Sequence, residues 1–237
     1  MHEAYRPISL IIALWPTREF EFPADVAAFG EQIRGQFTQF EEIRLMQAEG
    51  QLPPEMPCLV MIGQGGHWAL ELAPAKIVLR RMIETPAELD ELFAAVKTML
   101  MPIHAWMAEN NNLRVCRLGS LTQFFCDTRS SANDKIAAYF LQPRALQGQA
   151  PMEVQLGVLA RLALDDGSIV NRWLRVQPLR TADPRQLDLA AKIEVDLNTP
   201  AEDTHVRTGR DISNFIDAVQ KHLEERLPLL NDPDFFA

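Results

Sequence analysis

One order of segments occurs twice along this chain: a strand, a helix, a run of antiparallel strands and an amphipathic helix. In the first half, the pattern of apolar residues predicts a strand over 8–14 and a helix over 24–37. Short apolar segments separated by Pro and Gly clusters then predict four strands. These strands lie at 42–48, 58–63, 68–72 and 76–83. Thr85-Pro86-Ala87-Glu88 next supplies an N-cap, a proline at the first helical position and a capping-box glutamate for a helix reaching Ile103.

The second half repeats this order from a long strand predicted over 113–125. A short helix follows, capped by Ser130 or Ser131 and ending near Phe140. Three longer strands come next, the first two joined by an Asp166-Gly167 hairpin signal. These strands are predicted at 154–164, 168–179 and 187–197, and the closing helix at 211–227.

We therefore predict an α+β fold of two repeated strand-helix-antiparallel-meander-helix halves, 1–110 and 111–237. The apolar stripes of the two closing helices need a sheet to cover. The halves are compatible with one compact unit, in which a continuous antiparallel sheet has its helices packed on one face, and also with two separate domains. They share an order of elements and not residue identities, so convergence on a common α+β order is an alternative to duplication.

Composition excludes some functions. The 237 residues are 47% hydrophobic, which is enough for a full core, and the formal net charge is -9 with a pI near 5.1. No basic stripe is dense enough to bind phosphates, so nucleic acid is not expected as the main ligand. No run spans a bilayer, and the apolar run 8–15 lacks the basic flank of a signal peptide. We expect a cytoplasmic protein that does not associate with membranes.

The cysteines do not indicate a metal or redox site. Cys58, Cys116 and Cys126 are odd in number, and no two have the spacing of a zinc knuckle or a CxxC motif. Buried reduced thiols are the simpler interpretation. Cys116 or Cys126 as a nucleophile would need a histidine partner, and no local pattern supplies one.

His67 and Glu71 are the other candidates for chemistry. They are four residues apart on a predicted strand, where they would share a side and could act in acid-base catalysis or hold a metal with further ligands. A histidine beside the Gly65-Gly66 turn and an exposed glutamate are the alternative. Because no more groups converge on either pattern, we predict no catalytic residue, no metal and no cofactor.

Strand alternation separates two faces in the second half. Residues expected on the face away from the helices include Arg161, Asn171, Trp173 and Arg175, and Arg117 lies on the long strand before them. Trp and Arg often anchor interfaces, so we predict that these five residues bind a ligand or partner. The alternative is a solvated face on which Arg161, Arg175 and Glu194 form ordinary cross-strand ion pairs.

Several short motifs point to a family. They are Arg117-Leu118-Gly119-Ser120-Leu121, the 139–143 segment, Ile193-Glu194-Val195-Asp196-Leu197-Asn198 and Phe215-Ile216-Asp217. Over residues 112–230 the chain resembles a sporadically distributed, uncharacterised bacterial protein family of about this length. The family's usual aromatic directly after the Gly of the Arg-Leu-Gly strand is replaced here by Ser120, and its usual histidine in the last helix by Gln220. The resemblance brings no activity with it, and the family's patchy distribution is similar to that of accessory or defence-type genes.

We therefore expect a non-catalytic protein-interaction subunit or adaptor of a bacterial accessory or defence-type system, which binds a protein partner or a second copy. One alternative is a binder or sensor of an anionic small molecule, held in a cleft between the halves by Arg117, Arg161 and Arg175. Another is a hydrolase-like enzyme without a recognisable motif.

Overall fold

The computed structural model describes most of the chain. The described residues are 5–21, 24–37, 40–45, 53–83, 89–110, 113–128, 131–141, 154–179, 190–225 and 227. In chain order the elements are β1 (Tyr5–Pro16), α1 (Ala24–Gln36), β2 (Phe40–Leu45), β3 (Leu59–Gly63), a 3-10 turn (Gln64–Gly66), β4 (Trp68–Ala73), β5 (Lys76–Met82), α2 (Leu89–Asn110), β6 (Val115–Asp127), α3 (Ala132–Phe140), β7 (Leu156–Ala163), β8 (Ile169–Pro178), β9 (Ala190–Asn198) and α4 (Gly209–Glu225).

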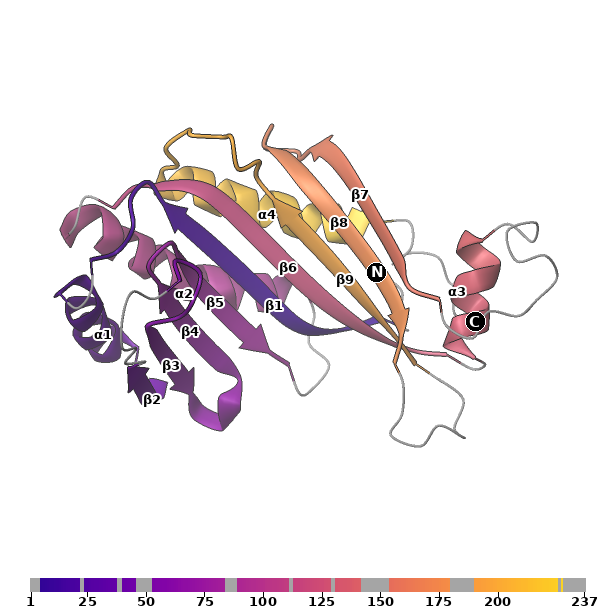
Figure 1. Ribbon diagram of the computed structural model, residues 1–237, viewed down its shortest axis with the longest axis horizontal. Helices are drawn as coiled ribbons and strands as arrows, with labels where there is room; N and C mark the ends of the chain where they lie inside the picture. Colours follow the sequence, from indigo (N-terminus) through magenta and orange to yellow (C-terminus); the bar gives the residue numbers. More distant parts are fainter. Residues whose placement is uncertain are drawn as a thin grey trace.

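The strands of the described residues form a single sheet of nine, in the order β2-β3-β4-β5-β1-β6-β9-β8-β7. Every neighbouring pair is antiparallel, so the predicted α+β class with an antiparallel sheet is confirmed. The long ladder between β1 and β6 joins the two halves of the chain, and Figure 1 shows these strands crossing the middle of the molecule. The halves therefore share one sheet.

The buried apolar side chains form a core cluster to which the sheet and both long helices contribute. α2 and α4 contact each other, and Figure 1 shows both behind the sheet in that view. The stripe predicted for the closing helix is buried at Ile212, Phe215, Ile216, Val219 and Leu223. The Phe29 and Trp106 rings meet edge-on with centroids 4.8 Å apart, which ties α1 to α2.

Some element boundaries differ from the predictions. α4 begins at Gly209 and not at Asp211, because Thr208 and Asp211 form a reciprocal cap ahead of it: the Asp211 carboxylate accepts from the Thr208 N–H at 2.7 Å, and Thr208 Oγ1 accepts from the Asp211 N–H at 3.2 Å. Ser131 is the N-cap of α3, and α2 runs through Pro102. The predicted capping motif at 85–88 lies outside the described residues.

No helix in the described part of the chain is both long and apolar enough to cross a membrane.

Candidate functional site

The two sides of the sheet differ in burial. Along β9 the side chains alternate between buried and partly exposed at every residue. The partly exposed positions of β9 lie in register with Asn171, Trp173 and Arg175 of β8. We call this side of the sheet the Trp173 face and the opposite, buried side the core face.

Cross-strand rows organise the Trp173 face. One row runs through Leu121, Asp196, Trp173 and Leu159, on the four strands β6, β9, β8 and β7. The next row runs through Gln123, Glu194, Arg175 and Gly157 on the same strands. Trp173 and Arg175 are thus two residues apart on β8, where strand geometry places their side chains side by side.

Three arginines stack on aromatic rings of this face. The Arg117 guanidinium carbon lies 4.4 Å from the centroid of the Trp15 ring, and that of Arg175 lies 5.4 Å from Trp173. At the other end of β6, Arg6 lies 5.4 Å from the Phe125 ring. Cation–π contacts of this kind hold a guanidinium flat while leaving its N–H groups able to bond outward.

Gly119 makes room for the Trp15–Arg117 stack. A glycine inside a strand is typical of a β-bulge, but β6 pairs continuously through Gly119 with Ala13 and Asn198. The irregularities in the β1–β6 ladder fall at Pro7/Ser9 and Trp15/Pro16. A Cβ atom at position 119 would instead collide with Asn198 Oδ1 and lie 2.9 Å from the Trp15 ring. The glycine therefore permits a close approach.

Two carboxylates of β9, Asp196 and Glu194, have pKa values shifted in opposite directions. Burial raises the pKa of Asp196, and it outweighs the Asn198 hydrogen bond and the Arg175 charge, which both act to lower it. Burial opposes ionisation of Glu194 too, but hydrogen bonds from Lys192 and Gln123 and the charges of Lys192 and Arg175 together hold its pKa below the usual value.

The Trp173 face is richer in cations than the chain as a whole. Strand register places eight cations and five carboxylates on it, whereas the whole chain has 23 cations and 32 carboxylates. The cations are Arg6, Arg44, Lys76, Arg80, Arg117, Arg161, Arg175 and Lys192, and the carboxylates are Glu42, Glu71, Asp127, Glu194 and Asp196. An acidic chain thus gathers basic side chains on one side of its sheet.

All five predicted binding residues lie on this face, at β6, β7 and β8. One ion pair of the alternative interpretation is present, since Arg175 pairs across the strands with Glu194 at 3.8 Å. Arg161 instead pairs with Glu202, in the turn after β9, at 2.9 Å and bonds Asn171 at 3.1 Å. Arg117 bonds the Thr199 carbonyl oxygen at 3.3 Å. Because two strands separate β6 from β7, roughly 14 Å lies between the strands of Arg117 and Arg161, so the three arginines do not converge on one small ligand.

Sequence reasoning missed three members of this cluster as site residues: Trp15, Asp196 and Asn198. Two of them surround the glycine on β6, and a glycine inside an otherwise regular strand was the available signal for a close neighbour. The sequence did not identify that neighbour, because register between distant strands is not visible in it.

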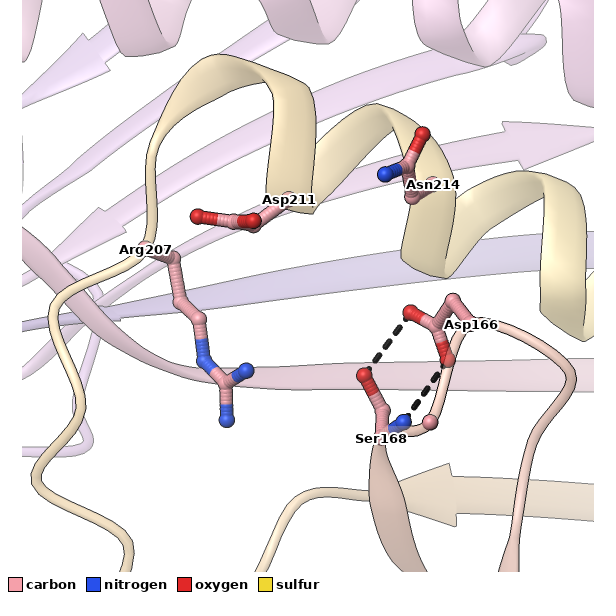
Figure 2. Close-up of a pocket in the computed structure, with 6 residues that line it drawn as sticks. Asp166, Ser168, Arg207, Asp211 and Asn214 are labelled. Atoms are coloured by element: carbon pink, nitrogen blue, oxygen red, sulfur yellow. Dashed lines mark hydrogen bonds between the residues drawn. The ribbon is translucent and has the colours of Figure 1, made fainter.

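A cavity of about 180 Å³ lies elsewhere, between the start of α4 and the β7–β8 hairpin. Figure 2 shows Arg207 and Asp211 on the α4 side, with Asp166 and Ser168 bonded to each other on the hairpin. Arg207 pairs with Asp203, and the Asp211 carboxylate accepts from both the N–H and the hydroxyl of Thr208. None of the predicted binding residues lines this cavity, and Asp166, Ser168, Arg207 and Asp211 each bond a partner in the hairpin or at the helix end.

The candidates for catalysis are not assembled. His67 lies at the end of the 3-10 turn and outside β4, so it does not share a strand with Glu71, which pairs with Arg80 at 3.5 Å. Burial raises the pKa of the Cys126 thiol to about 12 and also raises that of Cys58, so both are poor nucleophiles. Within the described ranges, no group of three or more His, Cys, Asp or Glu side chains could hold a metal ion.

Comparisons with known proteins give a similarity in structure and none in sequence. No protein-family model matches the chain, and no curated protein matches its sequence. Among solved structures, the chain is similar to one described as Methanococcus jannaschii TBP, at a TM-score of 0.27 and 12% identity, over 92% of this chain and 98% of that chain. A similarity at this TM-score carries no argument about function.

Proposed function

We propose that this chain is a non-catalytic protein-interaction subunit that docks an acidic, partly apolar protein surface on its Trp173 face. The observation that carries the proposal is the pair of arginine-on-tryptophan stacks, Arg117 on Trp15 and Arg175 on Trp173, on one partly exposed face. Tryptophan and arginine dominate interface hot spots, because they bury a large area and keep polar groups for bonding.

The proposal includes the predicted packing of the helices on one face and the repeated layout of the two halves. Its support is the set of contacts that α2 makes with β1 and β5, and α4 with β6, while α2 and α4 touch each other. In each half the last strand of the meander pairs with the first strand, β5 with β1 and β9 with β6. Two such halves joined at β1 and β6 leave the second face of a wide sheet for a partner.

Charge favours a protein partner over a nucleic acid. Most cations of the face are already paired within the fold, among them Arg6 with Asp127, Arg80 with Glu71 and Arg175 with Glu194. Binding to a phosphate backbone draws its affinity from cations that displace counterions, and interleaved carboxylates oppose it. A protein surface offers both signs of charge and an apolar centre for Trp173 and Leu159, which matches this mixture.

The kind of cellular system in which the protein would act is inferred from the family resemblance. A patchy bacterial distribution suggests an adaptor within an accessory or defence-type system, and this assignment is part of the same proposal.

The test is a comparative pull-down of the tagged full-length chain from its native host, with quantitative mass spectrometry. Trp173→Ala with Arg175→Ala should reduce capture of one or more identified proteins, because loss of a hot spot costs about 2 kcal/mol or more, a roughly 30-fold loss of affinity. The matched control is Trp68→Ala with Arg81→Ala, which removes a similar stack, 4.8 Å apart, from the core-face side of β4 and β5.

Partners lost equally from both double variants, or from neither, would exclude the Trp173 face as the docking site. Titration with a fluorescent single-stranded oligonucleotide tests whether the partner is a nucleic acid. Tight binding that Trp173→Ala abolishes would replace the protein partner with a nucleic acid.

A further inference from the structure

The sheet ends in two edge strands of opposite character. β2 is six residues long, with Glu41, Glu42 and Arg44 among them. β7 is eight residues long, and Arg161 is its one charged residue. No strand pairs with the outer side of β7 in the described part of the chain, and Figure 1 shows it at the margin of the sheet. A long, apolar edge with little charge is the kind that pairs with a further strand.

Exposed apolar side chains gather at this edge. Nine large hydrophobic residues are exposed among the described residues, and four of them lie on β7 or β8. They are Val158 (38% exposed), Leu159 (55%), Ile169 (46%) and Trp173 (37%). Singly exposed apolar residues are ordinary on a protein surface, but a cluster beside an unpaired strand indicates an interface.

The hairpin shows which backbone groups of β7 point outward. The Leu164 N–H donates to the Ser168 carbonyl oxygen at 2.9 Å, so the backbone of Leu164 points toward β8. Hydrogen-bonding direction alternates along an antiparallel strand. Gly157, Leu159, Arg161 and Ala163 therefore direct their N–H and C=O groups away from β8, where another strand can bond them.

We infer that β7 pairs antiparallel with β7 of a second copy of this chain, about a two-fold axis at Ala160. In this register Gly157 faces Ala163 of the second copy and Leu159 faces Arg161 of the second copy, so all four outward-pointing residues find partners within β7. The two Arg161 side chains stay apart, and the arginine stem covers the exposed leucine.

Self-pairing suits this strand better than pairing with an unrelated one. An antiparallel edge presents the same row of donors and acceptors after a two-fold rotation, so it is its own complement. The axis is perpendicular to the sheet, and the Trp173 faces of both copies therefore lie on the same side of one continuous sheet. The inference does not depend on the proposed function, since it rests on backbone groups and not on the arginine–tryptophan stacks.

Oppositely charged substitutions at Leu159 test the pairing. In sedimentation equilibrium of the full-length chain, the wild type should dimerise. Leu159→Lys places a lysine of each copy opposite Arg161 of the other copy, so like charges face each other twice in the dimer. The dimerisation affinity should fall about tenfold or more. Leu159→Glu removes the same apolar side chain but faces Arg161 of the second copy with a carboxylate. This variant should therefore dimerise more tightly than Leu159→Lys.

A cross-link tests the register. Ala160 faces itself across the axis in a non-hydrogen-bonded pair, with Cα atoms about 4.5 Å apart, within the range for a disulfide. Ala160→Cys should form a disulfide-linked dimer on mild oxidation, beyond any background from the wild-type cysteines. Gly157→Cys is the control on the same strand, because it lies six residues, roughly 20 Å, from its counterpart.

A monomer at every concentration would overturn the inference, as would equal weakening by Leu159→Lys and Leu159→Glu or equal cross-linking at positions 157 and 160. Circular dichroism of each variant establishes that it is folded. Sedimentation equilibrium of the Trp173→Ala with Arg175→Ala variant separates the two proposals, since a retained dimer with lost partner capture shows that the β7 pairing stands apart from docking on the Trp173 face.

Discussion

Phe124 and Phe125 are neighbours on β6, yet they lie on opposite sides of the sheet. Phe124 is fully buried in the core, whereas Phe125 is partly exposed on the Trp173 face beneath the Arg6 guanidinium. The same side-chain type thus serves the fold in one position and a surface contact in the next. The difference shows that position on the sheet, and not residue type, decides what an aromatic side chain does in this molecule.

The contrast extends over both faces. On the core face, burial of apolar side chains supplies stability that a single truncation can largely remove. On the Trp173 face, exposed ion pairs such as Arg161–Glu202 contribute little to stability, because water screens both charges. Side chains on this second face are therefore able to serve binding at little cost to the fold.

The largest effect should come from the Phe124 and Phe125 pair. Phe124→Ala should reduce the free energy of unfolding by about 3–5 kcal/mol, because it removes a large buried side chain and leaves a cavity. Phe125→Ala should cost about 1 kcal/mol or less, since its ring is part-exposed and the loss is mainly its contact with Arg6. Urea denaturation of both variants measures the difference, and equal losses would contradict the division into two faces.

A smaller effect is expected at Gly119. Gly119→Ala should destabilise the fold by about 1–3 kcal/mol, because the added methyl group meets Asn198 and the Trp15 ring. It should also displace the Trp15 ring, which near-ultraviolet circular dichroism can detect.

Gly157 on β7 is the matched control for that substitution. An added Cβ atom there meets nothing within 4 Å, so Gly157→Ala should be neutral or stabilise by about 0.4–1 kcal/mol through the unfolded state. Similar losses at both glycines would show that the effect reflects strand flexibility and not the packing around Trp15.

Much of the fold could be predicted, because the spacing of apolar residues along the sequence indicates each helix and strand. Alternation along β9 and the apolar stripe of α4 appear directly in the sequence, since each records which side of one element meets the core. The central pairing of β1 with β6 could not be predicted in the same way. Alternation identifies the buried face of a strand but not its neighbour, and these two strands are about a hundred residues apart.

The candidate site likewise has a part that could be predicted from the sequence and a part that could not. Trp173 and Arg175 were predicted because they share a strand and a parity, which is local information. The stack of Arg117 on Trp15 joins β6 to β1. The carboxylate of Asp196 lies between β6 and β8, whose residues Leu121 and Trp173 face it across the strands. Such contacts depend on register across the sheet, and register followed only from the structure.

The smallest effect, and the most selective, should come from the carboxylates of β9. Burial raises the pKa of Asp196, so the folded state disfavours its charged form and ionised Asp196 costs stability at neutral pH. Asp196→Asn keeps an oxygen that can accept the Asn198 hydrogen bond and removes that cost. The variant should unfold at a higher urea concentration than the wild type at pH 7, and the gap should close as the pH falls below about 4, where the wild-type carboxyl is neutral in both states.

Glu194→Gln should show the opposite sign on the same strand and face. Hydrogen bonds and nearby cations hold the pKa of Glu194 below its usual value despite burial, so its charged form stabilises the fold above the unfolded-state pKa. The variant should be less stable than the wild type at pH 7, and the deficit should vanish as the pH falls through the Glu194 pKa. Because the two variants remove the same charge, a shared sign in their urea midpoints would show that net charge governs the Trp173 face. Opposite signs would show that individual pairs govern it, as the partnered arginines of the proposed docking surface require.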